Sequence, residues 1–91
     1  MHFTKRLRAP ITRGEVTCSV RIWKSPRVRP GGRYALAHGH VRVTRIRQIA
    51  LCDITPELAR RSGFAGLVDL LKVARHGAGE NVYLIDFVFE E

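Results

Sequence analysis

The last stretch of this 91-residue chain reads as one strand with apolar side chains on both faces. From Asn81 to Phe89, one alternating set holds Val82, Leu84 and Val88, and the other holds Tyr83, Ile85, Phe87 and Phe89. A strand that is apolar on both faces is typical of the interior of a sheet, where both faces are covered. We therefore expect residues 81–89 to be a central strand, with the rest of the chain built around it.

A second strand is expected over residues 16–22, with ordinary alternation. Val16, Cys18, Val20 and Ile22 alternate with Thr17, Ser19 and Arg21. The two-residue period predicts one face in the core and one open polar face, which the ring of Trp23 continues. Two more strands are expected over residues 33–37 and about 40–51. In the longer strand the apolar phase slips after Val43, which predicts a β-bulge near residues 44–48.

Three helices complete the expected order of elements. Residues 3–9 have helical apolar spacing and are expected to form a short helix, which Pro10 is predicted to end or kink. Thr55 is a good N-cap before Pro56, with a helix end near Ser62 and Gly63 as a left-handed cap. A helix over residues 65–75, closed by Gly77, is expected to bury Leu67, Leu70, Leu71 and Ala74. The order predicts one α+β domain, residues 1–91, with a curled sheet or small barrel.

Basic residues are concentrated in the first half of the chain. Residues 1–49 hold twelve of the sixteen Lys and Arg against one acid, a net charge of +11, whereas residues 50–91 hold four basic and seven acidic groups, a net charge of −3. Thirteen of the sixteen are Arg, whose planar guanidinium suits phosphate recognition. Because a one-sided positive field attracts polyanions, we expect an anionic ligand, with nucleic acid first.

The candidate binding residues lie on the strand 16–22 and on the loop after it. They are Thr17, Ser19, Arg21, Trp23, Lys24, Arg27 and Arg29. Arg21 is expected either to anchor phosphate or a base edge, or to pair with an acid at the surface. Trp23 is expected either to stack on an unpaired base or to lie in the core or at its rim. Thr17 and Ser19 would donate hydrogen bonds to the ligand, and the loop would steer it.

Ser19 is also a weak candidate nucleophile. A serine hydroxyl needs a base within hydrogen-bond reach, and the alternating pattern turns Val16 toward the core. The alternative for Ser19 is a structural hydroxyl bonded to a neighbour in the strand.

The run Gly14-Glu15-Val16-Thr17-Cys18-Ser19-Val20-Arg21 resembles the signature G-x-K-x-x-E-x-R of the ASCH domain, a small β-barrel relative of the PUA RNA-binding domains. Gly14 and Arg21 match the signature. Ser19 stands at the glutamate position, where the family also accepts a hydroxyl residue. The run from 30 to 34 is similar to the family's glycine turn, and the stretch from 53 to 64 to its helix-turn-helix insert. The resemblance covers nearly the whole chain.

The resemblance implies a PUA-like curled barrel with flanking helices and a cleft that accepts RNA or a nucleoside. Some members are amidohydrolases that deacylate modified cytidine with a Lys, a Thr and a Glu, and others are reported as ribonucleases. Here Val16 stands at the lysine position and Ser62 near the glutamate position. The resemblance therefore implies RNA or nucleotide binding in a basic cleft beside the strand 16–23. The alternative is a ribonuclease or modified-nucleoside amidohydrolase with a non-standard active site.

The sequence gives less support to other classes of function. His38-Gly39-His40 has no Cys or acid at a zinc spacing, so a hairpin turn is expected there, and neither metal nor cofactor. There is no apolar run near 18 residues, and no apolar segment follows the basic start, so we expect no membrane contact, a cytoplasmic location, and reduced Cys18 and Cys52. An acidic protein partner is a third reading of the basic half, and the oligomeric state stays open.

Overall fold

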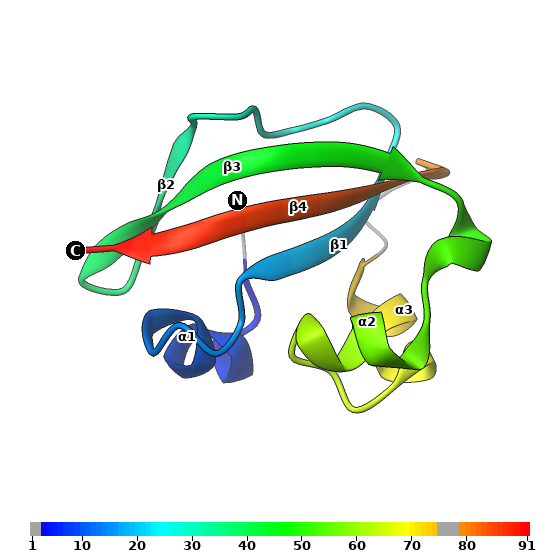
Figure 1. Cartoon of the computed structure of the whole chain (residues 1–91), viewed down its shortest axis with the longest axis horizontal. Helices are drawn as coiled ribbons and strands as arrows, with labels where there is room; N and C mark the ends of the chain where they lie inside the picture. The colour runs from blue at the N-terminus through cyan, green and yellow to red at the C-terminus, as the bar shows by residue number, and fades with distance from the viewer. Residues whose placement is uncertain (1–2, 75–78) are drawn as a thin grey trace.

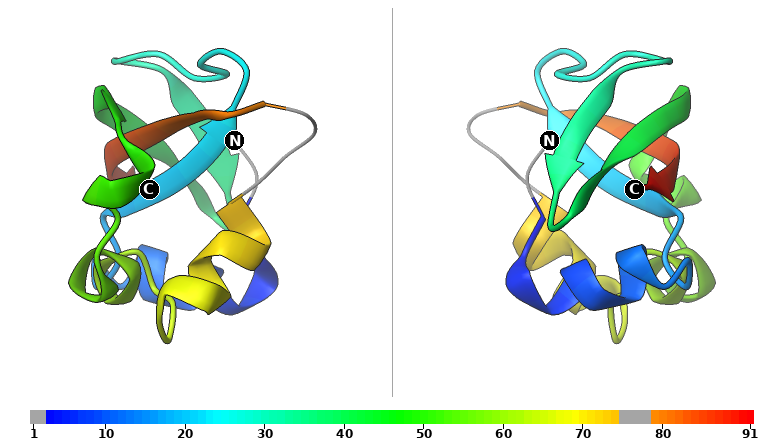
Figure 2. Two further views of the ribbon diagram at one scale, coloured as in Figure 1. Left: turned by 90° about the vertical axis from the view of Figure 1, so that its right-hand side faces the viewer. Right: turned by 90° about the vertical axis from the view of Figure 1, so that its left-hand side faces the viewer.

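The computed structural model describes residues 3–74 and 79–91. The elements are, in chain order, α1 (Lys5–Thr12), β1 (Cys18–Trp23), β2 (Arg33–Leu36), β3 (Gly39–Ile49), the 3-10 helix η1 (Leu51–Asp53), α2 (Pro56–Arg61), α3 (Leu67–Ala74) and β4 (Asn81–Glu90). The four strands form one antiparallel sheet in the order β1-β4-β3-β2. The sheet curls into a half-barrel, and the helices lie together on the side of β1 (Figures 1 and 2). The predicted α+β class and curled sheet are confirmed.

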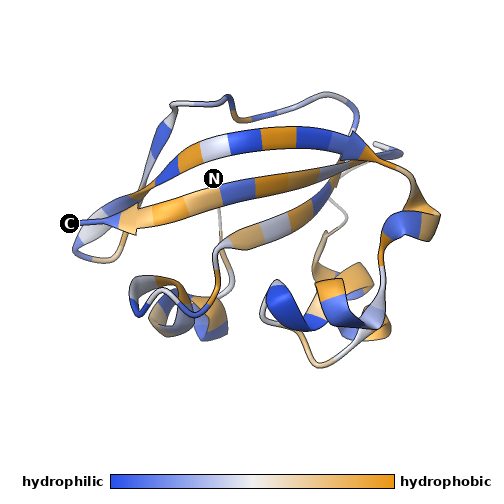
Figure 3. Ribbon diagram, in the orientation of Figure 1, coloured by the Kyte–Doolittle hydropathy of each residue, from blue (hydrophilic) through white to orange (hydrophobic). Residues whose placement is uncertain are grey.

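β4 is the interior strand that its two apolar faces predict. It pairs with β1 from Asn81 to Asp86, and with β3 from Val82 to Glu90. Residues 82–85 and Phe87 are buried. Figure 3 shows β4 as mostly hydrophobic, whereas hydrophilic and hydrophobic bands alternate along β3. The contrast follows from their positions, because both faces of β4 are covered over residues 82–85, whereas β3 has one face open over much of its length.

The predicted bulge lies in β3. Val43 pairs with Phe87 and Arg45 pairs with Asp86, so Thr44 is an extra residue that has no pairing partner on β4. The insertion shifts the alternation by one residue. As a result Val43 and Ile46 both pack on the core side, although they are three residues apart in the sequence.

The cap signals around α2 are confirmed. The hydroxyl of Thr55 accepts a hydrogen bond from the backbone N–H of Leu58 at 3.1 Å, and Pro56 is the first helical residue. Gly63 follows the helix with φ of +92°, the left-handed region that glycine adopts without a Cβ penalty. α3 begins at Leu67, two residues later than expected. Gly77 lies outside the described residues.

Two local predictions about the helices are wrong. α1 runs through Pro10 to Thr12 instead of ending there, and the carbonyl of Pro10 accepts hydrogen bonds from the backbone N–H groups of Glu15 and Val16 at 2.9 and 3.3 Å. The proline therefore lies in the last turn, close to where the chain reverses into β1. On α3, Leu70 and Ala74 are buried as expected and Leu67 is partly buried, but Leu71 is 40% exposed because this short helix contacts the sheet along a narrow stripe.

The buried apolar residues form one cluster that joins the N-terminal segment, the helices and the sheet. The rings of Phe3 and Phe87 meet edge to face with centroids 5.4 Å apart. Arg6 and Asp69 connect α1 to α3 through an ion pair of 2.7 Å. Both cysteines are free thiols, Cys18 buried and Cys52 exposed. In the part of the chain that the structure describes, no helix is long and apolar enough to span a bilayer.

Candidate nucleic-acid interface

The polar side of β1 is covered. Every residue of β1 is buried, and the side chains of Ser19, Arg21 and Trp23 are 6%, 5% and 4% exposed. The expectation of an open polar face on this strand is wrong for these three residues. The pairing with β4 gives the reason, because Ser19 and Arg21 lie opposite Ile85 and Tyr83, which point into the core side of the curled sheet.

Arg21 makes its contacts inside the fold. Its Nε donates a hydrogen bond to Ser19 Oγ at 2.8 Å, and its guanidinium lies over the ring of Phe3, 5.1 Å from the centroid. Loss of solvation on burial lowers the pKa of Arg21 to about 10. The guanidinium is therefore still charged at neutral pH, and its hydrogen bond and ring contact stabilise that charge.

Trp23 belongs to the core and supports the loop that follows. Its ring packs against that of Tyr83, with centroids 6.2 Å apart. The guanidinium of Arg27 lies 6.0 Å from the centroid of the Trp23 ring, within the range of a cation–π contact. Trp23 therefore holds a guanidinium from the loop on its ring.

The loop between β1 and β2, residues 24–32, is here called the basic loop. Lys24, Arg27 and Arg29 are all exposed, and across residues 3–74 and 79–91 no carboxylate forms an ion pair with them. The backbone is held at both ends: Asn81 Nδ2 donates to the carbonyl of Lys24 at 2.8 Å, and the N–H of Arg29 donates to the Tyr34 hydroxyl at 3.2 Å.

Gly79 lies against the start of the basic loop. A Cβ on Gly79 would lie 2.1 Å from the backbone N of Lys24 and 2.2 Å from the carbonyl carbon of Trp23. The chain before β4 therefore passes directly against the start of the basic loop. Thr17, by contrast, precedes the other end of β1. At about 3.3 Å per strand residue, it lies roughly 20 Å from the loop, so the structure does not bring it together with Lys24, Arg27 and Arg29.

Four further arginines share one face of the sheet, and reasoning from the sequence left their direction open. Arg33 of β2 lies directly opposite Arg42 of β3, and Arg45 and Arg47 of β3 lie opposite Asp86 and Leu84 of β4. Asp86 and Leu84 alternate with Ile85, which faces the core, so these arginines point away from Ser19 and Arg21. We call the surface made by Arg33, Arg42, Arg45 and Arg47 the arginine face. The phase slip that predicts the bulge is the signal that could have located it.

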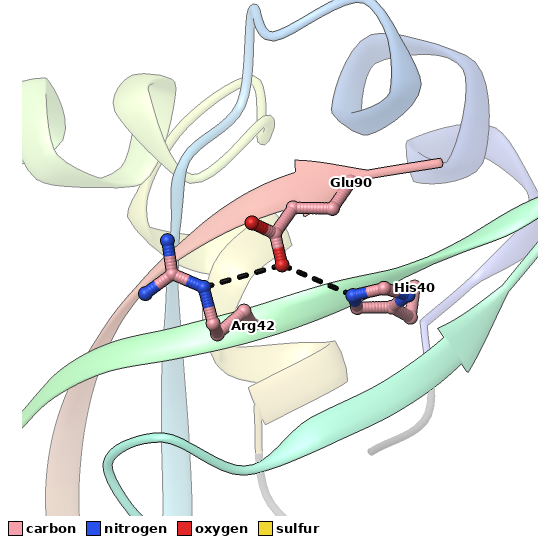
Figure 4. Close-up of polar contacts among 3 residues, drawn as sticks. All are labelled: His40, Arg42 and Glu90. Carbon is pink, nitrogen blue, oxygen red and sulfur yellow. Dashed lines mark hydrogen bonds and ion pairs between the residues drawn. The ribbon is translucent and has the colours of Figure 1, made fainter.

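Two acids accompany the arginine face. Glu90 Oε1 accepts from His40 Nε2 at 3.0 Å and from Arg42 Nε at 3.2 Å (Figure 4). The hydrogen bond from His40, with that from Arg42, holds the pKa of Glu90 below its usual value. Asp86 lies 3.8 Å from Arg47. Within the described residues, Arg33 and Arg45 have no carboxylate in ion-pair contact.

The remaining surface offers little for chemistry. A shallow depression between α2 and α3 is lined by Pro56, Arg60, Leu67, Val68, Asp69 and Lys72, among others. No group of three or more His, Cys, Asp or Glu that could hold a metal ion occurs in residues 3–74 and 79–91. What the molecule does present is a set of exposed guanidinium and ammonium groups on the basic loop and on the arginine face. No protein-family model, curated protein or solved structure matches this chain.

Proposed function

We propose that this protein is an RNA- or nucleotide-binding domain of the ASCH and PUA-like kind, and that its basic loop makes the principal contact with the ligand. The observation that supports this most directly is the state of Lys24, Arg27 and Arg29, three exposed cations without an acidic partner among the described residues. Cations on a solvated surface usually have acids interspersed with them. A cluster without acids attracts phosphates and releases their counterions on binding.

The fold is compatible with the family part of the proposal. The ASCH resemblance implies a curled barrel with flanking helices, and this chain has a curled four-stranded antiparallel sheet with its helices beside β1. In this proposal the buried Ser19, Arg21 and Trp23 have structural roles and do not contact the ligand. The hydrogen bond between Ser19 and Arg21 stabilises β1, and the Trp23 ring positions the guanidinium of Arg27.

RNA is favoured over a featureless polyanion by the position of Arg27. A guanidinium plane held against an aromatic ring keeps its other face free, and unpaired bases stack on such planes. Lys24 and Arg29 flank it and would contact phosphates on either side of a stacked base. Bases splayed from their neighbours are more available in single-stranded RNA than in a duplex.

The enzyme alternative finds no support in the position of Ser19. Its hydroxyl accepts a hydrogen bond from Arg21, whose protonated guanidinium is a donor and cannot act as a general base. A buried hydroxyl in that state lacks the activation that acyl or phosphoryl transfer requires. We therefore propose binding and not turnover.

The test is the affinity for a single-stranded RNA of about 20 nucleotides, measured by fluorescence anisotropy. The variant K24A/R27A/R29A removes the three loop cations, and the control R60A/R61A/K72A removes the same charge from exposed positions on α2 and α3. In 0.1 M salt the loop variant should bind roughly 100-fold more weakly, since each phosphate contact on a single strand adds about 0.7 to the salt slope. Equal losses in both variants would contradict a role for the loop, and preference for an acidic peptide over RNA would overturn the proposal.

A further inference from the structure

We infer that the arginine face is a second contact surface, which takes the phosphodiester backbone of the same RNA without reading its sequence. The inference rests on the proposed function and extends it from the basic loop to Arg33, Arg42, Arg45 and Arg47. These side chains come from two neighbouring strands and share one side of the sheet. None of them contributes to the apolar cluster.

The bulge at Thr44 is what gathers the arginines. Without an extra residue, strict alternation from Arg42 would turn Arg45 and Arg47 to the core side. With the bulge, both lie on the same side as Arg42, opposite Asp86 and Leu84 of β4. Bulges re-aim side chains and interrupt the ladder, so they are features that a strand keeps for a reason. Here the re-aimed residues are two arginines, and the face that they join is exposed.

The pair of Arg33 and Arg42 is unfavourable in the free protein. The two residues are directly opposite in an antiparallel pair, where like charges lower stability. Glu90 offsets the charge of Arg42, but no carboxylate among the described residues contacts Arg33. An anion placed between the two guanidinium groups would convert the repulsion into two charge-assisted hydrogen bonds. Local rules are broken most often where a ligand supplies the compensation.

The arginine face continues the basic loop. The N–H of Gly31 donates to the carbonyl of Val43 at 2.7 Å, and the N–H of Val43 donates to the carbonyl of Gly32 at 2.9 Å. The end of the basic loop is therefore bonded to β3 between Arg42 and the bulge, and Arg33 is the next residue after the loop. From Arg33 and Arg42 the arginine face runs back along β3 through Arg45 and Arg47, because the C-terminal end of β3 is level with the end of β1 where the loop begins. A strand of RNA bound to the loop would therefore have the arginine face alongside it.

The geometry fits phosphates and not bases. Arg45 and Arg47 are two residues apart on one strand, about 6.7 Å, and they project from a backbone that the ladder holds in place. Regularly spaced guanidinium groups on an open face form hydrogen bonds to phosphate oxygens, and such contacts position a nucleic acid without specifying its sequence. The rings of Tyr34, Tyr83 and Phe87 lie on the other side of the sheet, with the core-facing residues.

The experiment compares R33A/R45A with R60A/R61A, which removes the same charge from α2. The probe is the 20-nucleotide single-stranded RNA, titrated between 50 and 200 mM salt. Arg33 and Arg45 are exposed and lack acidic partners in the described part of the chain, so R33A/R45A should melt no lower than the parent protein. We expect the salt slope to fall in magnitude by about 1.4 and the affinity at 0.1 M salt to fall about 25-fold, equally for RNAs of different sequence.

A second variant is expected to strengthen RNA binding. E90Q removes the carboxylate that occupies Arg42, so it should tighten RNA binding severalfold, whereas E57Q on α2 should change it much less. If R33A/R45A behaves like R60A/R61A while K24A/R27A/R29A still loses affinity, the arginine face is not a contact surface and the proposed function stands. If the parent protein binds no RNA, both proposals are overturned.

Discussion

Arg21 Nε donates a hydrogen bond to Ser19 Oγ across 2.8 Å, and both side chains are buried on the core side of β1. A guanidinium in that position is costly to desolvate, and its pKa is lowered to about 10 accordingly. Two contacts offset this cost: Ser19 Oγ accepts a hydrogen bond from Arg21 Nε, and the ring of Phe3 lies next to the charged guanidinium. Loss of either partner leaves a buried polar group with a worse environment.

The first prediction concerns the stability that this pair contributes. R21A should lower the free energy of unfolding by roughly 2–3 kcal/mol, because a buried, charge-assisted hydrogen bond and a filled volume are lost together. S19A should cost about 1 kcal/mol. Urea denaturation of both variants and of the double variant measures their coupling, which should exceed about 0.5 kcal/mol. The exposed change R8A provides the comparison, and equal stabilities of R8A and R21A would refute a structural role for Arg21.

A second prediction uses two glycines with the same backbone conformation and different surroundings. Gly63 and Gly14 have φ of +92° and +76°. A Cβ on Gly63 would lie 2.4 Å from Leu7 Cδ2, whereas a Cβ on Gly14 would meet nothing within 4 Å. G14A should therefore cost about 1 kcal/mol of backbone strain, and G63A roughly 2–4 kcal/mol of strain and overpacking. Thermal melts of the two variants separate backbone strain from overpacking, and equal losses would mean that the Leu7 side chain moves aside for the added methyl group.

The third prediction concerns the titration of Glu90. Its pKa lies below the 4.5 of an unperturbed glutamate, because His40 and then Arg42 donate hydrogen bonds to it. A carboxyl whose folded-state pKa is lowered stabilises the protein above its unfolded pKa, and that stability is lost as the pH falls through the folded-state pKa. The carboxyl carbon of Glu90, followed by NMR, should titrate below pH 4.5 and move upward in H40A. An unchanged midpoint in H40A would rule out the contact drawn in Figure 4.

The fourth prediction concerns the start of α2. The Thr55 hydroxyl accepts from the N–H of Leu58, which otherwise has no partner in the first turn. T55A should lower the free energy of unfolding by about 1 kcal/mol, and T55S should restore most of it. The exposed change T44A is the reference for a threonine outside a cap. A T55A protein as stable as T44A would argue against the cap.

The elements that the sequence predicts well are those decided by local patterns. β4 is predictable as a central strand because apolar residues fall on both of its faces, and the bulge in β3 because the apolar phase slips after Val43. The ends of α2 follow from Thr55, whose hydroxyl caps the first turn, and from Gly63, which adopts the left-handed conformation after the last turn. In each case the physical cause lies within a few residues of the signal.

The site is harder to predict because its exposure is decided by distant segments. Alternation places Ser19 and Arg21 on one side of β1, but Phe3, from the start of the chain, and Tyr83, from β4, decide that this side is covered. The arginine face depends on the register between β2 and β3 and on the position of Thr44 within the bulge. A shift of one residue would turn Arg45 and Arg47 inward, and the phase slip places the bulge only within residues 44–48.

The affinity of the unaltered protein for single-stranded RNA, measured as a function of salt, tests the central claim most directly. If the exposed cations of the basic loop and the arginine face neutralise about five phosphates, log affinity should fall with log salt concentration at a slope of roughly −3.5. A slope near zero, or affinity no greater for RNA than for an uncharged polymer, would contradict the proposal that the exposed cations of these two surfaces hold a nucleic-acid backbone.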